Sequence, residues 1–285
     1  MEKILIYGTG TMGTGIAHVC AASGKTVFVV SARGGTERAE KGKAKIASFL
    51  DRAVQKGKET AERAEQTMGN IIPTADAGDV VSEADLVIEA AAEDMTVKKE
   101  FFKKLVEAGP GGDTILATNS SALSITEISN VTENPDRFLG IHFFNPAPVM
   151  KLVEIVKGLP TSDETVSRVQ AFVESLGKSP ILVNEAPGFV VNRILVPMIN
   201  EAAYALMEGV ASAEDIDSGM KLGANHPIGP LALADLIGLD VCLAVMETLY
   251  TEFGDTKYRP CPLLRKNVRA GYLGRKTKRG FFVYE

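Results

Sequence analysis

The first two thirds of the chain alternate short apolar runs with segments of helical periodicity. The runs KILIYG, TVFVVS, DLVIEAA, TILATNS and RFLGIHFF have the length of strands, are rich in Val, Ile, Leu and Phe, and end near Gly, Ser or Asn. Because these runs are apolar on both faces, they suit a buried, mainly parallel sheet covered by helices. The pattern predicts a doubly wound α/β domain over residues 1–186.

A strongly charged helical stretch, between Thr36 and Met68, separates two of these runs. It is longer than an ordinary crossover helix, so we expect a helix pair that projects from the sheet and breaks near Gly57. Arg52, Lys56 and Lys58 concentrate positive charge at one end of the stretch. They are candidates to meet an anionic ligand, and the alternative is a solvated helical face.

The pattern changes from about Pro187 onward. The stretches PGFVVNRILVPMINEAAYALMEG, SAEDIDSGMKLG and GPLALADLIGLDVCLAVMETLYTEFG carry apolar residues at helical spacing, with glycine at their ends. No stretch there has the pattern of a strand. The sequence therefore predicts an all-α C-terminal domain over residues 187–285, of ordinary domain size.

Composition excludes several classes of protein. The chain has 285 residues, of which 45% are hydrophobic and 24% charged, as in an ordinary globular protein. A net charge of −5 argues against a non-specific nucleic-acid binder, which needs Lys and Arg to displace counterions. No apolar run reaches the length of a membrane span, and no signal peptide is apparent, so we expect a cytoplasmic protein. Cys20, Cys242 and Cys261 lack C-x-x-C spacing, and we expect neither disulfides nor a metal site.

A glycine-rich turn follows the first apolar run. Gly8, Gly10 and Gly13 fit the spacing G-x-G-x-x-G, at the point where a strand passes into a helix. The first glycine permits a tight turn, the second lets pyrophosphate approach the backbone, and the third lets helix and strand pack closely. Thr11 and Met12 complete the loop at the helix N-terminus, where free N–H groups favour an anion. We predict a Rossmann-type dinucleotide site.

The end of the second apolar run bears on the choice of cofactor. An acidic residue at this point usually binds the ribose hydroxyls of NAD and repels a 2′-phosphate. This chain has Ser31 there, followed by Arg33, whose guanidinium can pair with a phosphate. The residues favour NADP(H); NAD(H) is the alternative if Arg33 points into solvent.

One of the three histidines is a candidate for acid–base chemistry. His142 lies at the end of a predicted strand, at the edge where open α/β sheets bind ligands, and Glu154 follows in an apolar segment. A carboxylate that holds one ring nitrogen selects the tautomer of a general acid–base histidine. The spacing leaves open whether Glu154 reaches His142. His18 and His226 are interpreted as structural or surface residues.

Taken together, the motifs resemble the short-chain L-3-hydroxyacyl-CoA dehydrogenase family, and most closely its bacterial 3-hydroxybutyryl-CoA members. The matching stretches run in family order over essentially the whole chain: GTGTMGTGIA, ADLVIEAAAEDMTVKK, ATNSSALSITEI, GIHFFNPAPVMKLVEIV, APGFVVNRILVPMINEA, EDIDSGMKLGANHPIGPL and GRKTKRGFF. The resemblance implies reversible hydride transfer between a nicotinamide and C3 of acetoacetyl-CoA or 3-hydroxybutyryl-CoA. It also implies a homodimer formed through the C-terminal domain and an active site between the domains.

The resemblance implies roles for individual residues. His142 is the acid–base residue, Glu154 orients it, and Asn192 and Ser121 contact the reacting oxygen or its surroundings. The positions matching the cofactor site of the family are Glu93, Lys98, Ser121, Asn145 and Lys276. The positions matching its coenzyme A site are Arg52, Lys56, Lys58 and Ser121.

The chain departs from the family pattern at three positions. Ser31 stands where the family usually has an acidic residue, Ala122 lacks a hydroxyl often found there, and Arg52 replaces a lysine. Three other functions remain open: a dehydrogenase of longer acyl chains, a reductase that does not use coenzyme A, and a dinucleotide-binding relative without turnover.

Overall fold

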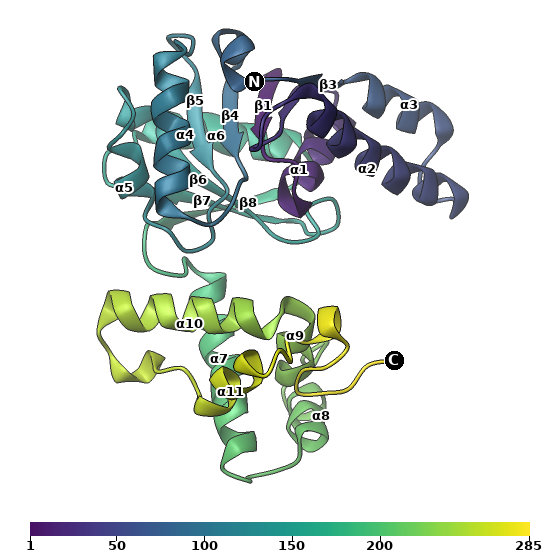
Figure 1. The fold of residues 1–285 in the computed structure, drawn as a ribbon, viewed down its shortest axis with the longest axis vertical. Helices are drawn as coiled ribbons and strands as arrows, with labels where there is room; N and C mark the ends of the chain where they lie inside the picture. The colour runs from purple at the N-terminus through teal and green to yellow at the C-terminus, as the bar shows by residue number, and fades with distance from the viewer. The chain divides into compact units, whose positions relative to one another are not determined.

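The computed structural model describes residues 1–285 and divides the chain into two compact units, Met1–Glu185 and Ala186–Glu285 (Figure 1). The first unit contains one eight-stranded sheet, in the order β3-β2-β1-β4-β5-β6-β7-β8. The strands are β1 (Lys3–Tyr7), β2 (Thr26–Val30), β3 (Ile71–Thr74), β4 (Leu86–Glu89), β5 (Ile115–Thr118), β6 (Phe138–Phe143), β7 (Leu152–Lys157) and β8 (Ser179–Asn184). Neighbouring strands are parallel except for β6 and β7. The predicted doubly wound, mainly parallel sheet is confirmed.

The five apolar runs of the sequence form β1, β2, β4, β5 and β6, whereas β3, β7 and β8 were not predicted. Both outer strands contain a proline, Pro73 in β3 and Pro180 in β8. Proline cannot donate to a sheet ladder, so it is tolerated at a sheet edge while weakening the local strand pattern.

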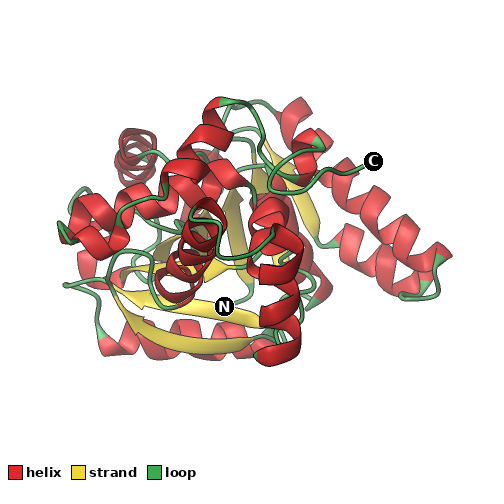
Figure 2. Cartoon of the chain, turned by 90° about the horizontal axis from the view of Figure 1, so that it is seen from below, coloured by secondary structure: helices red, strands yellow, loops and turns green.

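Helices cover the sheet on both faces (Figure 2). Ile4 and Ile6 of β1 share a core with Ile16 of α1 and Val169 of α6, on one face of the sheet. On α4, Phe102 is fully buried and packs edge-on against Phe101 and Phe138. The helices of this unit are α1 (Thr11–Ala22), α2 (Thr36–Gln55), α3 (Ala61–Gly69), α4 (Met95–Glu107), α5 (Ile125–Ser129) and α6 (Asp163–Ser175), with short 3-10 turns η1 (Ala77–Asp79), η2 (Val81–Glu83) and η3 (Pro135–Arg137).

The charged stretch after β2 forms the expected helix pair, α2 and α3, which projects beside β3 (Figure 1). Gly57 ends α2 in the left-handed region with φ of 64°, and the Thr60 side chain caps α3 by accepting a hydrogen bond from the backbone N–H of Arg63. Gly42 of α2 packs directly on the glycine loop, because a Cβ there would lie 2.8 Å from Cγ2 of Thr9. The base of the helix pair therefore touches the predicted cofactor loop.

The second unit is helical, as the sequence predicts. Its elements are α7 (Val191–Met207), α8 (Ala213–Gly223), α9 (Pro230–Ile237), α10 (Leu239–Phe253) and α11 (Pro262–Arg269), with 3-10 turns η4 (Thr256–Tyr258) and η5 (Arg275–Thr277). Buried Asp235 fastens the C-terminal segment by accepting hydrogen bonds from the backbone N–H groups of Phe281 and Phe282 and from the Tyr284 hydroxyl. Neither unit contains a helix with both the length and the apolar character of a membrane span.

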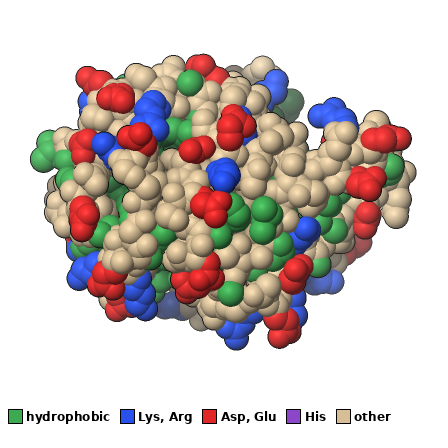
Figure 3. All heavy atoms as spheres, turned by 90° about the horizontal axis from the view of Figure 1, so that it is seen from above, with side chains coloured by type: hydrophobic (Ala, Val, Ile, Leu, Met, Phe, Trp, Pro, Cys, Tyr) green, Lys and Arg blue, Asp and Glu red, His purple; other side chains and the backbone are tan.

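Acidic and basic side chains are interspersed on the surface drawn in Figure 3. This mixture agrees with the small net charge of −5.

Candidate functional site

The antiparallel pairing of β6 and β7 brings His142 and Glu154 together. The two residues lie directly opposite each other in the ladder, and Nδ1 of His142 lies 2.7 Å from Oε2 of Glu154. Both are buried, with 6% of His142 and 0% of Glu154 exposed. A buried carboxylate on one ring nitrogen fixes the orientation of the imidazole, so the site contains the elements of an oriented acid–base group.

The glycine loop has the geometry that an anion site requires. Gly8 has φ of 126°, and a Cβ on it would lie 2.4 Å from the carbonyl oxygen of Ala90. A Cβ on Gly13 would lie 2.0 Å from the carbonyl oxygen of Gly8, so the first and third glycines are required by close packing. Around Gly10 there is open space, with no heavy atom within 4 Å of a Cβ position. Gly10 caps α1 without a side-chain hydrogen bond, which leaves helix N–H groups for a pyrophosphate.

A cavity of about 340 Å³ opens beside this loop, at the carboxyl ends of β1, β2 and β3. Tyr7, which stacks on Phe101, and Ser31 line it together with Asp76. Burial and the nearby carboxylate of Asp76 raise the pKa of the Tyr7 hydroxyl. An aromatic ring with polar groups beside it at this edge suits the adenosine half of a dinucleotide.

Two arginines meet where β2 passes into α2. Ser31 is buried, and its hydroxyl accepts a hydrogen bond from the backbone N–H of Arg33 at 3.3 Å. Both Arg33 and Arg38 are exposed, and the Arg38 guanidinium donates to the carbonyl oxygen of Arg33 at 2.6 Å. Arg38 was not predicted as a site residue from the sequence, although a second arginine in the first turns of the predicted helix indicates it.

A buried ion pair lies at the ends of β4 and β5. The Lys98 ammonium donates to both carboxylate oxygens of Glu89, at 2.9 and 2.8 Å, with 1% and 0% of the two side chains exposed. Glu89 also accepts hydrogen bonds from the Thr118 hydroxyl and the backbone N–H of Ala91. Glu89 was not predicted as a site residue, because a single acidic residue in an apolar run does not reveal its partner. The pair sets the position of Lys98.

Glu93 connects this pair to Ser121. One carboxylate oxygen of Glu93 lies 3.4 Å from the Lys98 ammonium, and the other accepts from the backbone N–H groups of Ser121 and Ala122 and from the Ser120 hydroxyl. Burial alone would raise the pKa of Glu93, but Lys98 and these hydrogen bonds together hold it below its ordinary value. Glu93 therefore remains ionised at neutral pH and keeps Ser121 in place.

The loop between β6 and β7 carries Asn145, which is exposed and precedes the cis-peptide bond to Pro146. Lys178 donates to the carbonyl oxygens of Ala147 and Met150 in this loop, at 2.7 and 2.8 Å. Burial lowers the pKa of Lys178. The loop after His142 is thus held by a lysine that sequence analysis did not single out.

The remaining predicted site residues belong to the second unit or to the end of α2 and the turn after it. Asn192 lies in the first turn of α7, and Lys276 forms an ion pair with Asp240 at 2.5 Å, both within the second unit. Arg52 and Lys56 lie at the end of α2, and the Arg52 Nε donates to the carbonyl oxygen of Ser48. None of Arg52, Lys56 and Lys58 forms an ion pair, so their charges are available to a ligand.

Comparison with known proteins finds matches over essentially the whole chain. Residues 3–186 match the NAD binding domain of 3-hydroxyacyl-CoA dehydrogenase, and residues 188–284 match its C-terminal domain. A probable 3-hydroxybutyryl-CoA dehydrogenase of Bacillus subtilis is 51% identical over 285 residues, which span 100% of this chain and 98% of the relative. The 3-hydroxybutyryl-CoA dehydrogenase of Clostridioides difficile is 52% identical over 282 residues, 99% of each chain.

A solved structure is equally similar. The crystal structure of (S)-3-hydroxybutyryl-CoA dehydrogenase from Ralstonia eutropha has a TM-score of 0.95 and 52% identity, and the match covers 100% of this chain and 99% of that one. Sequence motifs, fold and full-length similarity thus agree, and the chain belongs to the 3-hydroxyacyl-CoA dehydrogenase family.

Proposed function

We propose that this dehydrogenase acts on 3-hydroxybutyryl-CoA and acetoacetyl-CoA. The observation that carries the proposal is the buried contact of 2.7 Å between His142 and Glu154, in a chain whose similar relatives are named for this substrate. A dehydrogenase of longer acyl chains is the second candidate, since one methylene changes discrimination by only about 1–3 kcal/mol.

The mechanism centres on proton transfer by His142. A bound nicotinamide supplies or accepts the hydride at C3 of the substrate. In reduction, the His142 imidazolium gives a proton from Nε2 to the C3 oxygen, while Glu154 holds Nδ1. In oxidation, the neutral imidazole removes the hydroxyl proton. Ser121, and Asn192 by family resemblance, hydrogen-bond the same oxygen and stabilise the charge that develops there.

We further propose that the cofactor is NADP(H). Ser31 carries no charge to repel a 2′-phosphate, and two exposed guanidinium groups, those of Arg33 and Arg38, lie at the same turn. Two features favour NAD(H) instead, namely Asp76 in the neighbouring cavity and the solvent exposure of Arg33. The glycine loop, Glu93, Lys98, Asn145 and Lys276 serve the parts that both cofactors share.

The other partners follow from charge and exposed apolar surface. Arg52, Lys56 and Lys58 attract the anionic coenzyme A to a protein whose net charge is −5. The second unit exposes several large apolar side chains, which supports a homodimer formed through it; among them are Ile194, Val210 and Leu222. We also propose that the enzyme is cytoplasmic, where its soluble substrates would be available.

The test is reduction of acetoacetyl-CoA with NADPH and NADH in parallel, with kcat/KM measured for each. Turnover with a higher kcat/KM for NADPH is the expected result. A preference for NADH would overturn the cofactor assignment while leaving the substrate assignment intact. If acetoacetyl-CoA is reduced with neither NADPH nor NADH, while longer 3-oxoacyl-CoA substrates are reduced, the dehydrogenase of longer acyl chains is favoured.

A further inference from the structure

One lysine binds three backbone carbonyl groups of the loop between β6 and β7. This loop comprises residues 144–151, and Lys178 lies in the turn between α6 and β8. The Lys178 ammonium donates to the carbonyl oxygens of Ala147 at 2.7 Å, Pro148 at 3.3 Å and Met150 at 2.8 Å. A lysine ammonium has three donors and no acceptor, so the loop supplies one acceptor for each donor.

Apolar packing fixes little of this loop. Ala147 is its one buried residue, whereas Val149 and Met150 are 65% and 41% exposed. The backbone N–H groups of Val149 and Met150 both donate to the carbonyl oxygen of Pro146 at 3.0 Å, so these hydrogen bonds stay within the loop. The Lys178 side chain therefore connects the exposed part of the loop to the rest of the unit.

The backbone of Lys178 is itself fixed between a helix and a strand. Gly177 follows the end of α6 in the left-handed region, with φ of 69°, and the backbone N–H of Lys178 donates to the carbonyl oxygen of Val173 at 3.3 Å. The next residue, Ser179, begins β8 and pairs with Leu152 of β7. Lys178 forms no ion pair, so its ammonium is free of carboxylates that would compete with the loop.

The same loop packs against the helix that follows the glycine loop. A Cβ on Gly15 of α1 would lie 3.2 Å from the Cβ of Ala147. Gly15 is about one turn from the N-terminus of α1, where free N–H groups favour the pyrophosphate of a dinucleotide. Asn145, near the start of the loop, is exposed. The contact at Gly15 and the hydrogen bonds from Lys178 together set where the loop lies beside the cofactor helix.

We propose that Lys178 is a positioning residue for the cofactor, because its three hydrogen bonds fix the loop that presents Asn145 to the dinucleotide. Asn145 makes the contact, and Lys178 acts through it. This inference rests on the proposed function, in which Asn145 serves the part that NADP(H) and NAD(H) share. Since that part is the same in both cofactors, loss of the Lys178 ammonium should weaken both by the same factor and leave the preference between them unchanged.

The first test measures the Kd of NADPH and of NADH by fluorescence titration. Lys178→Met removes the donors and is expected to raise both Kd values by about tenfold, the equivalent of one charge-assisted hydrogen bond, and Lys178→Arg should restore part of the affinity. Lys43→Met is the matched control, because Lys43 donates to the single carbonyl oxygen of Ile71, at 2.8 Å. Unchanged Kd values in Lys178→Met, or a change for one cofactor alone, would overturn the proposal.

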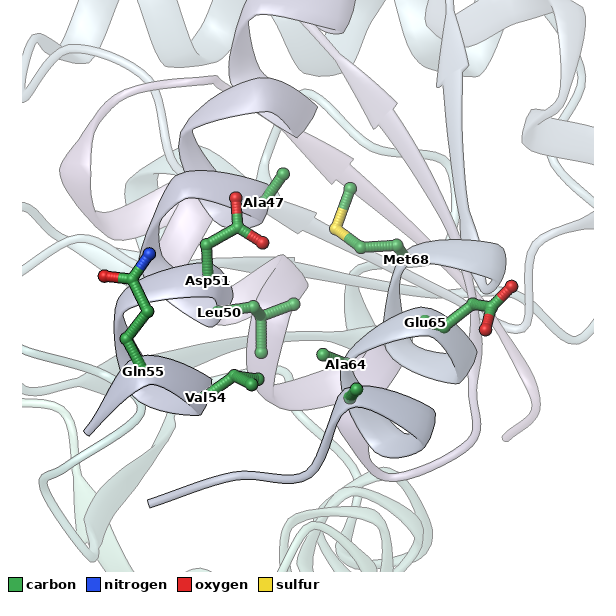
Figure 4. Close-up of a pocket in the computed structure, with 9 residues that line it drawn as sticks. Ala47, Leu50, Asp51, Val54, Gln55, Ala64, Glu65 and Met68 are labelled. Carbon is green, nitrogen blue, oxygen red and sulfur yellow. The ribbon is translucent and has the colours of Figure 1, made fainter. Parts of the chain in front are cut away.

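A second variant distinguishes positioning from a general loss of stability. Met68 of α3 lines a hollow of about 420 Å³ between α2 and α3, together with Leu50 and Ala64 (Figure 4). Met68→Ala should lower the free energy of unfolding in urea through lost apolar contacts in the same unit, and should leave both Kd values near those of the wild type. Kd values that rise in Met68→Ala as much as in Lys178→Met would overturn the positioning role.

The last test separates this inference from the proposed function. Asn145→Ala should raise both Kd values, and Lys178→Met should add little in the double variant, because the two residues act through one contact. Additive effects would overturn the route through Asn145. If Asn145→Ala leaves both Kd values unchanged, the proposed cofactor contact of Asn145 fails, and the inference fails with it. If Asn145→Ala raises them and Lys178→Met does not, only the role of Lys178 fails.

Discussion

The carboxyl ends of β4 to β6, with the facing first half of β7, and the region from the end of β2 through α2 carry opposite kinds of polar site. At the first, the pairs His142–Glu154 and Glu89–Lys98 are buried, and their charged groups lie within 2.9 Å of a partner. At the second, Arg33, Arg38, Lys45 and Arg52 are exposed, and the side chains of Arg38, Lys45 and Arg52 donate to carbonyl oxygens rather than to carboxylates.

The difference follows from solvation. A buried charge is costly unless every polar atom has a partner, and the structure contains no buried side-chain nitrogen or oxygen without one. Groups held in this way have one geometry, which suits proton transfer. Exposed cations keep their hydration and their mobility, and salt screens them, which suits recognition of flexible, highly charged ligands. Substitutions should therefore have large effects at the first site and smaller, salt-dependent effects at the second.

The largest effect is expected at the acid–base pair. Replacing His142 with Gln should lower kcat by at least about a hundredfold, since positioned acid–base groups contribute about 10²–10⁴. Steady-state kinetics give kcat, and titration of the cofactor should show little change in its affinity. A near-normal kcat would remove His142 from the mechanism and weaken the contrast between the two regions.

The next effect concerns stability. Lys98→Met leaves Glu89 buried without its counter-ion and should reduce the free energy of unfolding by about 3–5 kcal/mol, measured by urea denaturation. Lys99→Met is the matched control, because the neighbouring Lys99 pairs with Glu127 near the surface, where such pairs contribute about 0–1 kcal/mol. Similar decreases in the free energy of unfolding for the two variants would show that burial does not determine how much the Glu89–Lys98 ion pair contributes to stability.

At the exposed turn after β2, substitutions should alter selectivity. Ser31→Asp combined with Arg33→Ala should lower the ratio of kcat/KM for NADPH to that for NADH by about tenfold or more, because a carboxylate repels the 2′-phosphate and one guanidinium is lost. Arg63→Ala on α3 provides a control for the loss of an exposed arginine. An unchanged ratio would contradict the assignment of the 2′-phosphate to this turn.

The smallest effect is expected for the lysines at the end of α2. Replacing Lys56 and Lys58 with Ala should raise the KM for acetoacetyl-CoA by about two- to tenfold at low ionic strength and less at high salt, since screening weakens exposed charges. A truncated thioester should respond less. Lys266→Ala with Arg269→Ala on α11 changes the net charge equally and serves as control. An increase that does not depend on salt would argue against a solvated charge contact.

The sequence by itself determined the features that depend on local pattern. Apolar runs predicted the five central strands, and glycines at positions requiring a turn or close packing predicted the cofactor loop and the break at Gly57. The helical periodicity after Pro187 likewise predicted the all-α unit. Backbone conformation and burial act over a few residues, so a single segment contains enough information for such predictions.

Only the tertiary structure decided which polar groups meet. The contact between His142 and Glu154 depends on the antiparallel register of β6 and β7, and β7 was not predicted as a strand. The pairing of Glu89 with Lys98 joins a strand to the following helix. A hydrogen bond depends on tenths of an ångström between atoms on different elements, and that separation is set by the packing of the whole sheet rather than by any one segment.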